Sequence, residues 1–277
     1  MKYFYLYINI SLLGLFLTAA QASEPATSLS PLDVAKNVVN RSASKARIGY
    51  MHFIMRNKSG SERKRSALLV HSQEPAHTKI GIYFTKPAGL QNTSFLSQDN
   101  SDSQDQNWLY LPATDRVRKL PASSRGDYFM GTDLSYGDIK ENFKFALEDW
   151  DFSLAEQQIE GDKSYYILQG TPKNEDIKQE LGYASFTSKI DAQTWFPVNI
   201  KYTDIYNAPL KEISILALDM IAKTWIATHF SVFNSQLSHQ TEIVLSDMQY
   251  LPNLPSNILT ADELAYGAPL MLLNEGE

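Results

Sequence analysis

The sequence has no cysteine among its 277 residues. Disulfide bonds are therefore excluded, and so are zinc sites built on thiolates and cysteine nucleophiles. A lipid attached through an N-terminal cysteine is excluded as well, so the chain is not itself a lipoprotein. The length suffices for one sizeable hydrophobic core and is too short for several large domains.

Long apolar runs are also missing. The densest run, LLGLFL at Leu12–Leu17, is shorter than the ~20 apolar residues of a membrane-spanning helix. It follows Lys2 and precedes Ala20–Ala22, whose small-x-small pattern is typical of a signal-peptide cleavage site. We predict a cleaved signal peptide at residues 1–22 and a single mature domain at residues 23–277, soluble in the periplasm, with an uncleaved anchor as the alternative.

Basic residues are too few to suggest nucleic acid binding. The chain has 25 Lys and Arg against 31 Asp and Glu, and removing residues 1–22 takes only Lys2 from this count, leaving 24 against 31 and a net charge of −7. Nucleic acid binding rewards a basic face, so a nucleic acid partner is disfavoured. Two basic stretches, Arg63–Arg65 and Asp115–Leu120, are interpreted as solvated strand faces or, alternatively, as a docking patch for an anionic head group or partner.

Catalytic and metal-binding spacings are absent from the sequence. The histidines follow neither HxH nor HExxH spacing, and the chain has no GxSxG, P-loop or GxGxxG segment. A Ser–His–Asp set whose members lie far apart in sequence stays open. We therefore expect a protein that is not an enzyme and that has neither a metal nor a cofactor. The histidines are His52, His71, His77, His229 and His239.

Aromatic residues are abundant, with 15 Tyr and 13 Phe, and they favour β-structure. From Ala46 onward apolar and polar residues alternate with a period of two, interrupted by short turns such as Asn57–Gly60, Gly161–Asp162 and Ala222–Lys223. Hairpin connections of this kind predict an antiparallel sheet of about 10–11 strands. A sheet of this size curls rather than staying flat.

Two segments outside the strands are available to cover the concave side of this sheet. PLDVAKNVVN at Pro31–Asn40 predicts an amphipathic helix with Ser30 as its N-cap and with Leu32, Ala35, Val38 and Val39 in its apolar stripe. The stretch Ala122–Glu148 interrupts the strands. The predicted fold is mainly β (α+β): a curved, incompletely closed antiparallel β-barrel with helices covering the concave face.

The stretch GDYFMGTDLSYGDI at Gly126–Ile139 needs its own interpretation. Its three aspartates are six and five residues apart, whereas a helix–loop–helix calcium loop has oxygen ligands at nearly every second residue. Asp133 is better interpreted as the N-cap of a short helical turn, with Gly131 allowing a tight backbone before it. The stretch is therefore predicted to be a structural elbow that carries Phe129 and Met130 toward apolar surroundings.

The longer stretch NWLYLPATDRVRKLPASSRGDYFMGTDLSYGDI resembles the signature of the LolA-like superfamily of periplasmic outer-membrane lipoprotein-sorting proteins. The resemblance is to a branch with a W-x-Y-L-P strand, an R-V-R-x-[IL] strand and an F-M-G-[ST]-D-[FL]-S-Y-x-D loop, and it covers most of Ala35–Leu264. Gly137 departs from the acidic residue that the branch often has there, and Asn207–Ala208 replaces a usual turn glycine. The matching residues are Trp108, Tyr110, Leu111, Pro112, Arg116, Val117, Arg118, Phe129, Met130, Gly131, Asp133, Ser135, Tyr136 and Asp138.

The resemblance implies an unclosed barrel with a helical lid that holds the acyl chains of a lipoprotein or a related lipid. Acyl chains in water cost about 0.8 kcal/mol per CH₂, so a carrier needs an apolar cavity with adaptable Met and aromatic side chains. Arg118 and Arg125 are candidate head-group contacts. The candidate cavity-lining residues are Met51, Phe53, Met55, Ile80, Ile82, Phe84, Trp108, Tyr110, Phe129, Met130, Phe143, Phe145, Phe196 and Ile200, and the motif residues expected to be structural are Gly131, Asp133, Tyr136 and Asp138.

Two hypotheses about function follow from this resemblance. The first is a periplasmic carrier or chaperone that moves lipoprotein acyl chains or related lipids toward the outer membrane, with an inner-membrane transporter, such as an RND-type exporter, and an outer-membrane acceptor as partners. The second is a non-enzymatic envelope binding or sensor module, or an accessory of an RND-type exporter, on the same fold. Co-purified lipid favours the first, and a stoichiometric membrane-protein partner without lipid favours the second.

Overall fold

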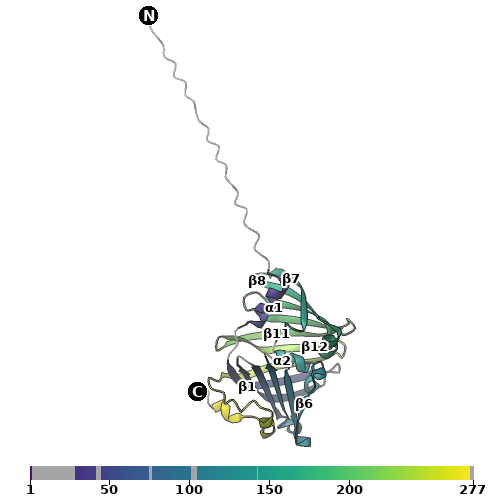
Figure 1. Ribbon diagram of the computed structural model, residues 1–277, viewed down its shortest axis with the longest axis vertical. Coiled ribbons are helices and arrows are strands. Elements are labelled where there is room, and N and C mark those ends of the chain that lie inside the picture. The colour runs from purple at the N-terminus through teal and green to yellow at the C-terminus, as the bar shows by residue number, and fades with distance from the viewer. Residues whose placement is uncertain (2–28, 42–44, 75–76, 101–104, 142, 275–277) are drawn as a thin grey trace.

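Thirteen antiparallel strands form one curved sheet in the computed structural model, which describes residue 1 and residues 29–41, 45–74, 77–100, 105–141 and 143–274 (Figure 1). The curved antiparallel sheet predicted from the sequence is confirmed, with thirteen strands in the described residues where ten or eleven were expected. The strands are β1 (Ala46–Arg56), β2 (Glu62–Gln73), β3 (His77–Lys86), β4 (Ser94–Asn100), β5 (Gln106–Leu111), β6 (Arg116–Leu120), β7 (Trp150–Glu160), β8 (Lys163–Pro172), β9 (Tyr183–Asp191), β10 (Pro197–Asp204), β11 (Pro209–Ile221), β12 (Thr224–Asn234) and β13 (His239–Tyr250).

The strand order explains why one connection has to cross the sheet. The order is β6-β5-β4-β3-β2-β1-β13-β12-β11-β10-β9-β8-β7, so the chain starts in the middle, runs outward to the β6 edge and returns inward from the β7 edge. The two edge strands β6 and β7 each have one strand partner within the described residues, and the barrel is therefore not closed. Residues 121–149 link the two edges, and we call them the crossing segment.

Local turn chemistry accounts for the hairpins. Ala222 and Lys223 both have positive φ, 47° and 63°, as a two-residue type I′ turn between twisted strands requires. Gly161 has a φ of 63° between β7 and β8. The side chain of Asn57 accepts hydrogen bonds from the backbone N–H groups of Ser59 and Ser61 between β1 and β2. The three turns predicted from the sequence are thus confirmed.

Helix α1 (Pro31–Val39) packs against β7 and β8 at one end of the sheet (Figure 1). The hydroxyl of Ser30 accepts a hydrogen bond from the backbone N–H of Asp33, so the predicted N-cap is confirmed. The buried stripe is Val34, Ala35 and Val38, and not one that includes Leu32, which is exposed. The other helices are α2 (Tyr136–Glu141), α3 (Glu175–Leu181), which the strand pattern did not indicate, and the 3₁₀ turns η1 (Ala88–Leu90), η2 (Pro112–Thr114), η3 (Ala122–Ser124), η4 (Phe129–Gly131), η5 (Asp262–Tyr266) and η6 (Leu270–Asn274).

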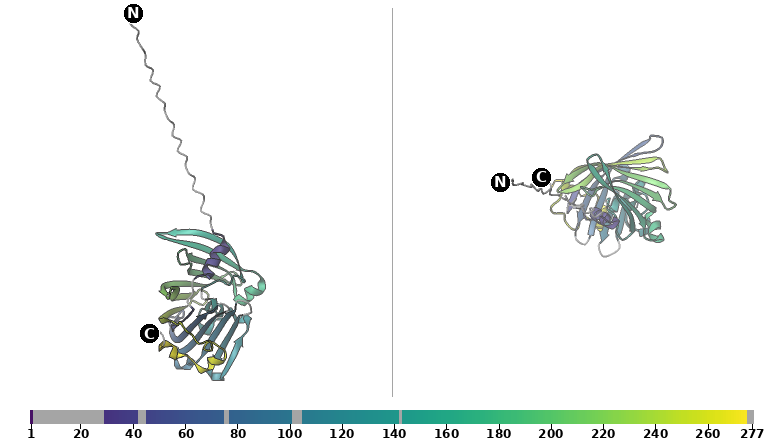
Figure 2. Two further views of the ribbon diagram at one scale, coloured as in Figure 1. Left: turned by 60° about the vertical axis from the view of Figure 1, so that its left-hand side comes forward. Right: turned by 90° about the horizontal axis from the view of Figure 1, so that it is seen from above.

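The two faces of the sheet carry separate hydrophobic cores, because successive side chains of a strand point to opposite faces. The core on the concave face collects residues from both halves of the sheet, α1 and the crossing segment. The core on the outer face is smaller and is covered by the C-terminal residues that include η5 and η6, through Leu251, Leu259, Leu264 and Leu272 (Figure 2). The concave face is therefore the one whose cover is a connecting segment.

The expected signal peptide at residues 1–22 lies outside the described residues except for Met1, and it stays a prediction. Within the described ranges, no helix combines the length and the apolar composition that crossing a membrane requires.

Candidate functional site

The crossing segment fills the concave face with the ring of Phe129. This side chain has an exposed fraction of 0% and lies in a cluster of four other rings. Its ring centroid is 5.2 Å from that of Phe95, 5.5 Å from Tyr136, 6.2 Å from Phe84 and 6.5 Å from Phe53. The elbow predicted from the sequence therefore inserts an aromatic side chain into the hollow of the sheet.

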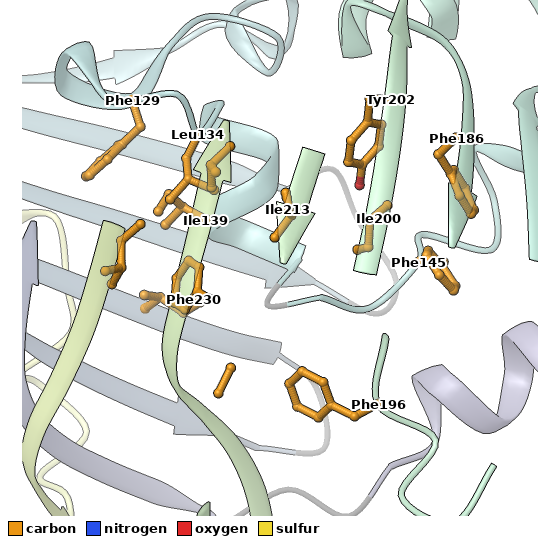
Figure 3. Close-up of a cluster of buried hydrophobic side chains, with 14 of the residues drawn as sticks. Phe129, Leu134, Ile139, Phe145, Phe186, Phe196, Ile200, Tyr202, Ile213 and Phe230 are labelled. Atoms are coloured by element: carbon orange, nitrogen blue, oxygen red, sulfur yellow. The ribbon is translucent and has the colours of Figure 1, made fainter. Parts of the chain in front are cut away.

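Most of the predicted lining residues share this concave core. Figure 3 shows part of the core, with side chains from β9 to β12 and from the crossing segment pointing toward one another. Phe143 lies at the centre of one aromatic group, 5.0 Å from Phe230 and 5.8 Å from Phe196 between ring centroids. The structure places Met51, Phe53, Met55, Ile80, Ile82, Phe84, Phe129, Phe145, Phe196 and Ile200 inside this core, with Met130 and Phe143 packed against it.

Trp108 and Tyr110 do not belong to this surface. Both lie in the core of the outer face, and the Tyr110 hydroxyl donates a hydrogen bond to Asp115 at 3.0 Å. Leu109, between them, packs against the concave core instead. Because strand side chains alternate, aromatic residues at 108 and 110 cannot face the same side as Leu109, and the assignment of these two residues to the cavity is corrected.

The predicted head-group arginines also have other roles. Arg125 is largely buried and donates to the carboxylate of Asp149 at 2.6 Å, with Glu180 at 3.8 Å. It thus ties the start of the crossing segment to its end and to α3. Arg118 lies exposed on edge strand β6, paired in register with Leu109. The structure therefore does not bring these two arginines together.

Asp133 anchors the crossing segment to strand β13 rather than capping a helix. Its carboxylate accepts hydrogen bonds from His239 Nδ1 and Thr241 Oγ1, each at 2.6 Å. The backbone N–H of Asp133 donates to the same Thr241 hydroxyl at 3.0 Å. The N-cap predicted at Asp133 is therefore wrong, because β13 offers its side chain two donors within the core.

The cap of α2 is a reciprocal pair between Ser135 and Asp138. The Ser135 hydroxyl accepts from the backbone N–H of Asp138 at 3.1 Å, and the Asp138 carboxylate accepts from the backbone N–H of Ser135 at 2.6 Å. This is a capping box with an aspartate at the third helical position. The preceding backbone needs Gly131, whose φ is 71°, and the carbonyl of Met130 accepts a hydrogen bond from Arg65 on β2.

Asp138 also forms a buried ion pair with Lys211 of β11. The two side chains have exposed fractions of 5% and 1%. The Lys211 ammonium lies 4.8 Å from the ring centroid of Tyr183 and 5.5 Å from that of Tyr202, where the ring faces attract a cation. Burial, followed by the neighbouring Asp138 carboxylate, raises the pKa of Tyr183 well above its ordinary value.

The partners of this network come from strands far away in sequence, and sequence reasoning missed them. Lys211, Tyr183, His239 and Thr241 lie on β11, β9 and β13. One signal was available in the sequence. Lys211 lies two residues before Ile213 and therefore on the same buried face of strand β11, where a charged residue is unusual. A lysine on the buried face of a strand indicates a countercharge buried beside it.

The concave core leaves a small cavity of about 50 Å³ beside the crossing segment. Ligand pockets of proteins usually measure about 300–1,000 Å³. This cavity is much smaller, because the side chains on its opposite walls pack close to one another. The cavity is lined by Arg47, Met51, Leu69, His71, Ile80, Ile82, Leu134, Asp138, Ile139, Phe143, Ile226, Ala227, Phe230 and Leu245. Its walls are mainly apolar and can hold hydrocarbon, and Arg47, His71 and Asp138 are the charged or polar residues among them.

A metal site has no support in the described part of the chain. No group of three or more His, Asp or Glu side chains there has the proximity to hold a metal ion. Asp133 is instead engaged by His239 and Thr241, and Asp138 by Lys211 and Ser135.

The capping box gives a first prediction. Ser135→Ala is expected to lower the free energy of unfolding by about 1–2 kcal/mol, because the N–H of Asp138 loses its acceptor inside the core. Urea denaturation measures this change. Ser123→Ala, an exposed position in the same segment, is the matched control and is expected to change stability by less than about 0.5 kcal/mol. Equal effects of the two substitutions would exclude the capping role.

The model of a protein family described as "Uncharacterized protein" matches residues 76–265. No curated protein matches the chain. Among solved structures, a domain from Vibrio parahaemolyticus assigned to outer membrane lipoprotein sorting is similar, with a TM-score of 0.76, 22% identity, and coverage of 84% of this chain and 97% of that one.

Two further structures support the same fold. A DUF1329 family protein from Desulfovibrio piger has a TM-score of 0.75 at 22% identity and covers 84% of this chain and 97% of its own. A LolA superfamily protein from Nitrosomonas europaea has a TM-score of 0.63 at 15% identity, with coverage of 85% and 99%. At these identities the likeness establishes a LolA-like fold.

Proposed function

We propose that this chain, which belongs to the family whose model matches residues 76–265, is a non-enzymatic carrier of acyl chains. The cargo is the acylated part of a lipoprotein or a related lipid, held in the concave face of the sheet. The carrier acts in the periplasm and passes its cargo toward the outer membrane.

The observation that carries this proposal is the cover of the concave face. A single sheet buries an apolar inner surface, and the opposing surface is a connecting segment and α1 rather than a second sheet. A connecting segment can move away from the concave face without breaking the strand pairing of the sheet. The cavity of about 50 Å³ at this boundary is the place where such a movement would admit a ligand.

The energetics favour exchange of the cover for an acyl chain. Each CH₂ transferred from water into an apolar site contributes about 0.8 kcal/mol. The surface that the chain would enter is mainly apolar, and the aromatic side chains of Phe143 and Phe230 offer it contacts. A ligand of this kind therefore needs no polar groups in the walls of the cavity.

Three further observations support the cellular part of the proposal. The expected signal peptide directs the chain out of the cytoplasm. The similar domain from Vibrio parahaemolyticus is assigned to outer membrane lipoprotein sorting. The absence of cysteine agrees with a carrier that is not itself lipid-anchored. An inner-membrane donor, such as an RND-type exporter, and an outer-membrane acceptor complete the proposed route.

Native mass spectrometry of the mature protein from the periplasm of its own source tests the proposal directly. We expect an acylated species of defined mass to remain bound and to appear in an organic extract. A protein that is empty, and that stays empty after incubation with lipids and an acylated lipoprotein, would contradict the carrier function. A stoichiometric membrane-protein partner in that case would favour an exporter accessory.

Filling the cavity is expected to block binding. Ala227 is buried and lines the cavity, so Ala227→Phe places a ring where the ligand would lie. We expect Nile red, a neutral apolar probe, to bind about tenfold more weakly or worse, with overpacking costing about 1–3 kcal/mol of stability. Fluorescence titration measures the affinity, and near-ultraviolet circular dichroism checks the fold.

The matched control is Ala217→Phe on the neighbouring strand β11, where Ala217 is exposed. This variant is expected to bind Nile red as the wild type does. A folded Ala227→Phe variant with wild-type affinity would show that the probe binds elsewhere.

A further inference from the structure

Two cationic or polar side chains lie at one end of the concave face, inside its apolar core. Arg47 on β1 and His71 on β2 are directly paired in register and point to the same face. Their exposed fractions are only 4% and 3%. The residue opposite His71 on β3 is Ile80, so the row continues into the apolar wall of the cavity.

Each of these side chains has one buried polar atom without a hydrogen-bond partner among the described residues. Nε of Arg47 and Nδ1 of His71 are buried without a hydrogen bond among the described residues. Burying a guanidinium without a countercharge costs the folded state several kcal/mol of desolvation free energy, because no ion pair offsets the lost hydration. Buried polar atoms without a hydrogen bond are uncommon in the interior of a protein, and a ligand that accepts or donates the missing hydrogen bond is one reason for them.

The cation Lys144 lies near this pair, since its charge acts on His71 and the charge of Arg47 acts on Lys144 in turn. Lys144 follows Phe143 in the crossing segment and borders a small cavity that shares Asp138 and Phe143 with the main one. Burial, followed by the charges of Arg41 and Arg47, lowers the pKa of Lys144 to about 8. Burial also lowers the pKa of Arg47 to about 10, and that of Arg41 to about 9.

His71 responds to the same positive field. Burial, followed by the charges of Arg47 and Lys144, lowers the pKa of His71 well below its ordinary value. The imidazole is therefore neutral at neutral pH and can donate one hydrogen bond. Asp138 is the carboxylate that borders the cavity, and Lys211 already neutralises it.

We propose that Arg47, His71 and Lys144 bind the anionic group of the acylated ligand, while its hydrocarbon chain lies along the apolar walls of the same cavity. The chemical class is an acyl chain that ends in, or lies next to, a carboxylate or a phosphate. This inference rests on the proposed carrier function and adds a requirement for negative charge to it. An anion at this position supplies a countercharge to Arg47 and an acceptor for Arg47 Nε, neither of which comes from the described residues.

The site has the two-part geometry that an amphiphile needs. Arg47 and His71 lie at one end of the cavity, and Met51, Leu69 and Ile82 continue the same faces of β1, β2 and β3. The arginines expected from the sequence to hold a head group cannot do so here, because Arg125 is bound to Asp149 and Arg118 lies on the exposed sheet edge.

The test compares ligands with one chain length and different head groups. Calorimetric titrations use laurate, which carries a carboxylate, 1-lauroyl-lysophosphatidate, which carries a phosphate, and the neutral dodecanol. We expect at least one of the two anions to bind the wild-type protein about tenfold or more tightly than dodecanol. The stronger of the two identifies the head group as a carboxylate or a phosphate.

Substitution then assigns the charge to these residues. Arg47→Met is expected to weaken binding of the preferred anion by about ten- to a hundredfold and to leave dodecanol within about threefold. Lys144→Met, at a half-buried position outside the sheet, is expected to act in the same direction if Arg47→Met fails to fold. Arg118→Met removes an exposed arginine and is expected to change neither affinity.

The outcomes separate this inference from the carrier function. If dodecanol binds the wild type as tightly as both anions, or if Arg47→Met weakens all three ligands equally, the anion site is wrong and the carrier stands. If none of the three binds, the carrier function fails together with the anion site.

Discussion

Lys211→Met is expected to lower the free energy of unfolding by about 3–5 kcal/mol. The substitution leaves the Asp138 carboxylate buried, with an exposed fraction of 5%, and without its countercharge. The remaining donors to Asp138, the backbone N–H of Ser135 and the hydroxyl of Tyr183, carry no positive charge. Urea denaturation followed by tryptophan fluorescence measures the loss.

A rescue variant separates loss of the charge pair from loss of packing. Lys211→Met combined with Asp138→Asn removes both charges and keeps an acceptor for the Ser135 N–H, so it is expected to recover to within about 1.5 kcal/mol of the wild type. Lys189→Met, which breaks the more exposed pair of Lys189 with Glu160, is the control and is expected to cost less than about 1 kcal/mol. A single Lys211→Met variant as stable as this control would contradict the structural role of the pair.

Phe129→Ala is expected to destabilise the protein by about 3–5 kcal/mol. The ring is completely buried and contacts the rings of Phe53, Phe84, Phe95 and Tyr136, so its removal leaves a cavity between β1, β3, β4 and the crossing segment. Thermal and urea unfolding both report the change.

The control for this substitution is Phe233→Ala on β12. Phe233 has an exposed fraction of 46%, so its removal is expected to cost less than about 1 kcal/mol. If Phe129→Ala cost no more than Phe233→Ala, the crossing segment could not be packed on the concave face as described.

The two predictions concern the same architectural question, which is how a connecting segment stays on a sheet that it could leave. Its middle is held by aromatic packing at Phe129 and by polar contacts of Asp133 and Asp138 to three strands. Its later part, around Phe143 and Lys144, is only half-buried. The motif itself is therefore the anchored part of the cover, and the residues next to the cationic cluster are less strongly held.

Much of the fold could be predicted because its information is local. A period of two along Ala46–Arg56 or His77–Lys86 and turn residues such as Ala222–Lys223 act over a few residues, and these strands and hairpins lie where the pattern indicates. The lining set could be predicted only partly, since alternation assigns faces relative to a neighbour and not to the concave side. Trp108 and Tyr110 were placed on the wrong face for that reason.

The sequence by itself determined an antiparallel sheet with hairpin connections, an N-capped first helix and a structural elbow at Phe129, because propensity, periodicity and capping depend on near neighbours. Only the tertiary structure decided which polar groups meet. Lys211 reaches Asp138 across 73 residues of sequence. Arg47 faces His71 in a core whose described residues leave Arg47 Nε and His71 Nδ1 without a hydrogen bond. Electrostatic pairing and its absence depend on distance in space and on burial, and the sheet order sets both.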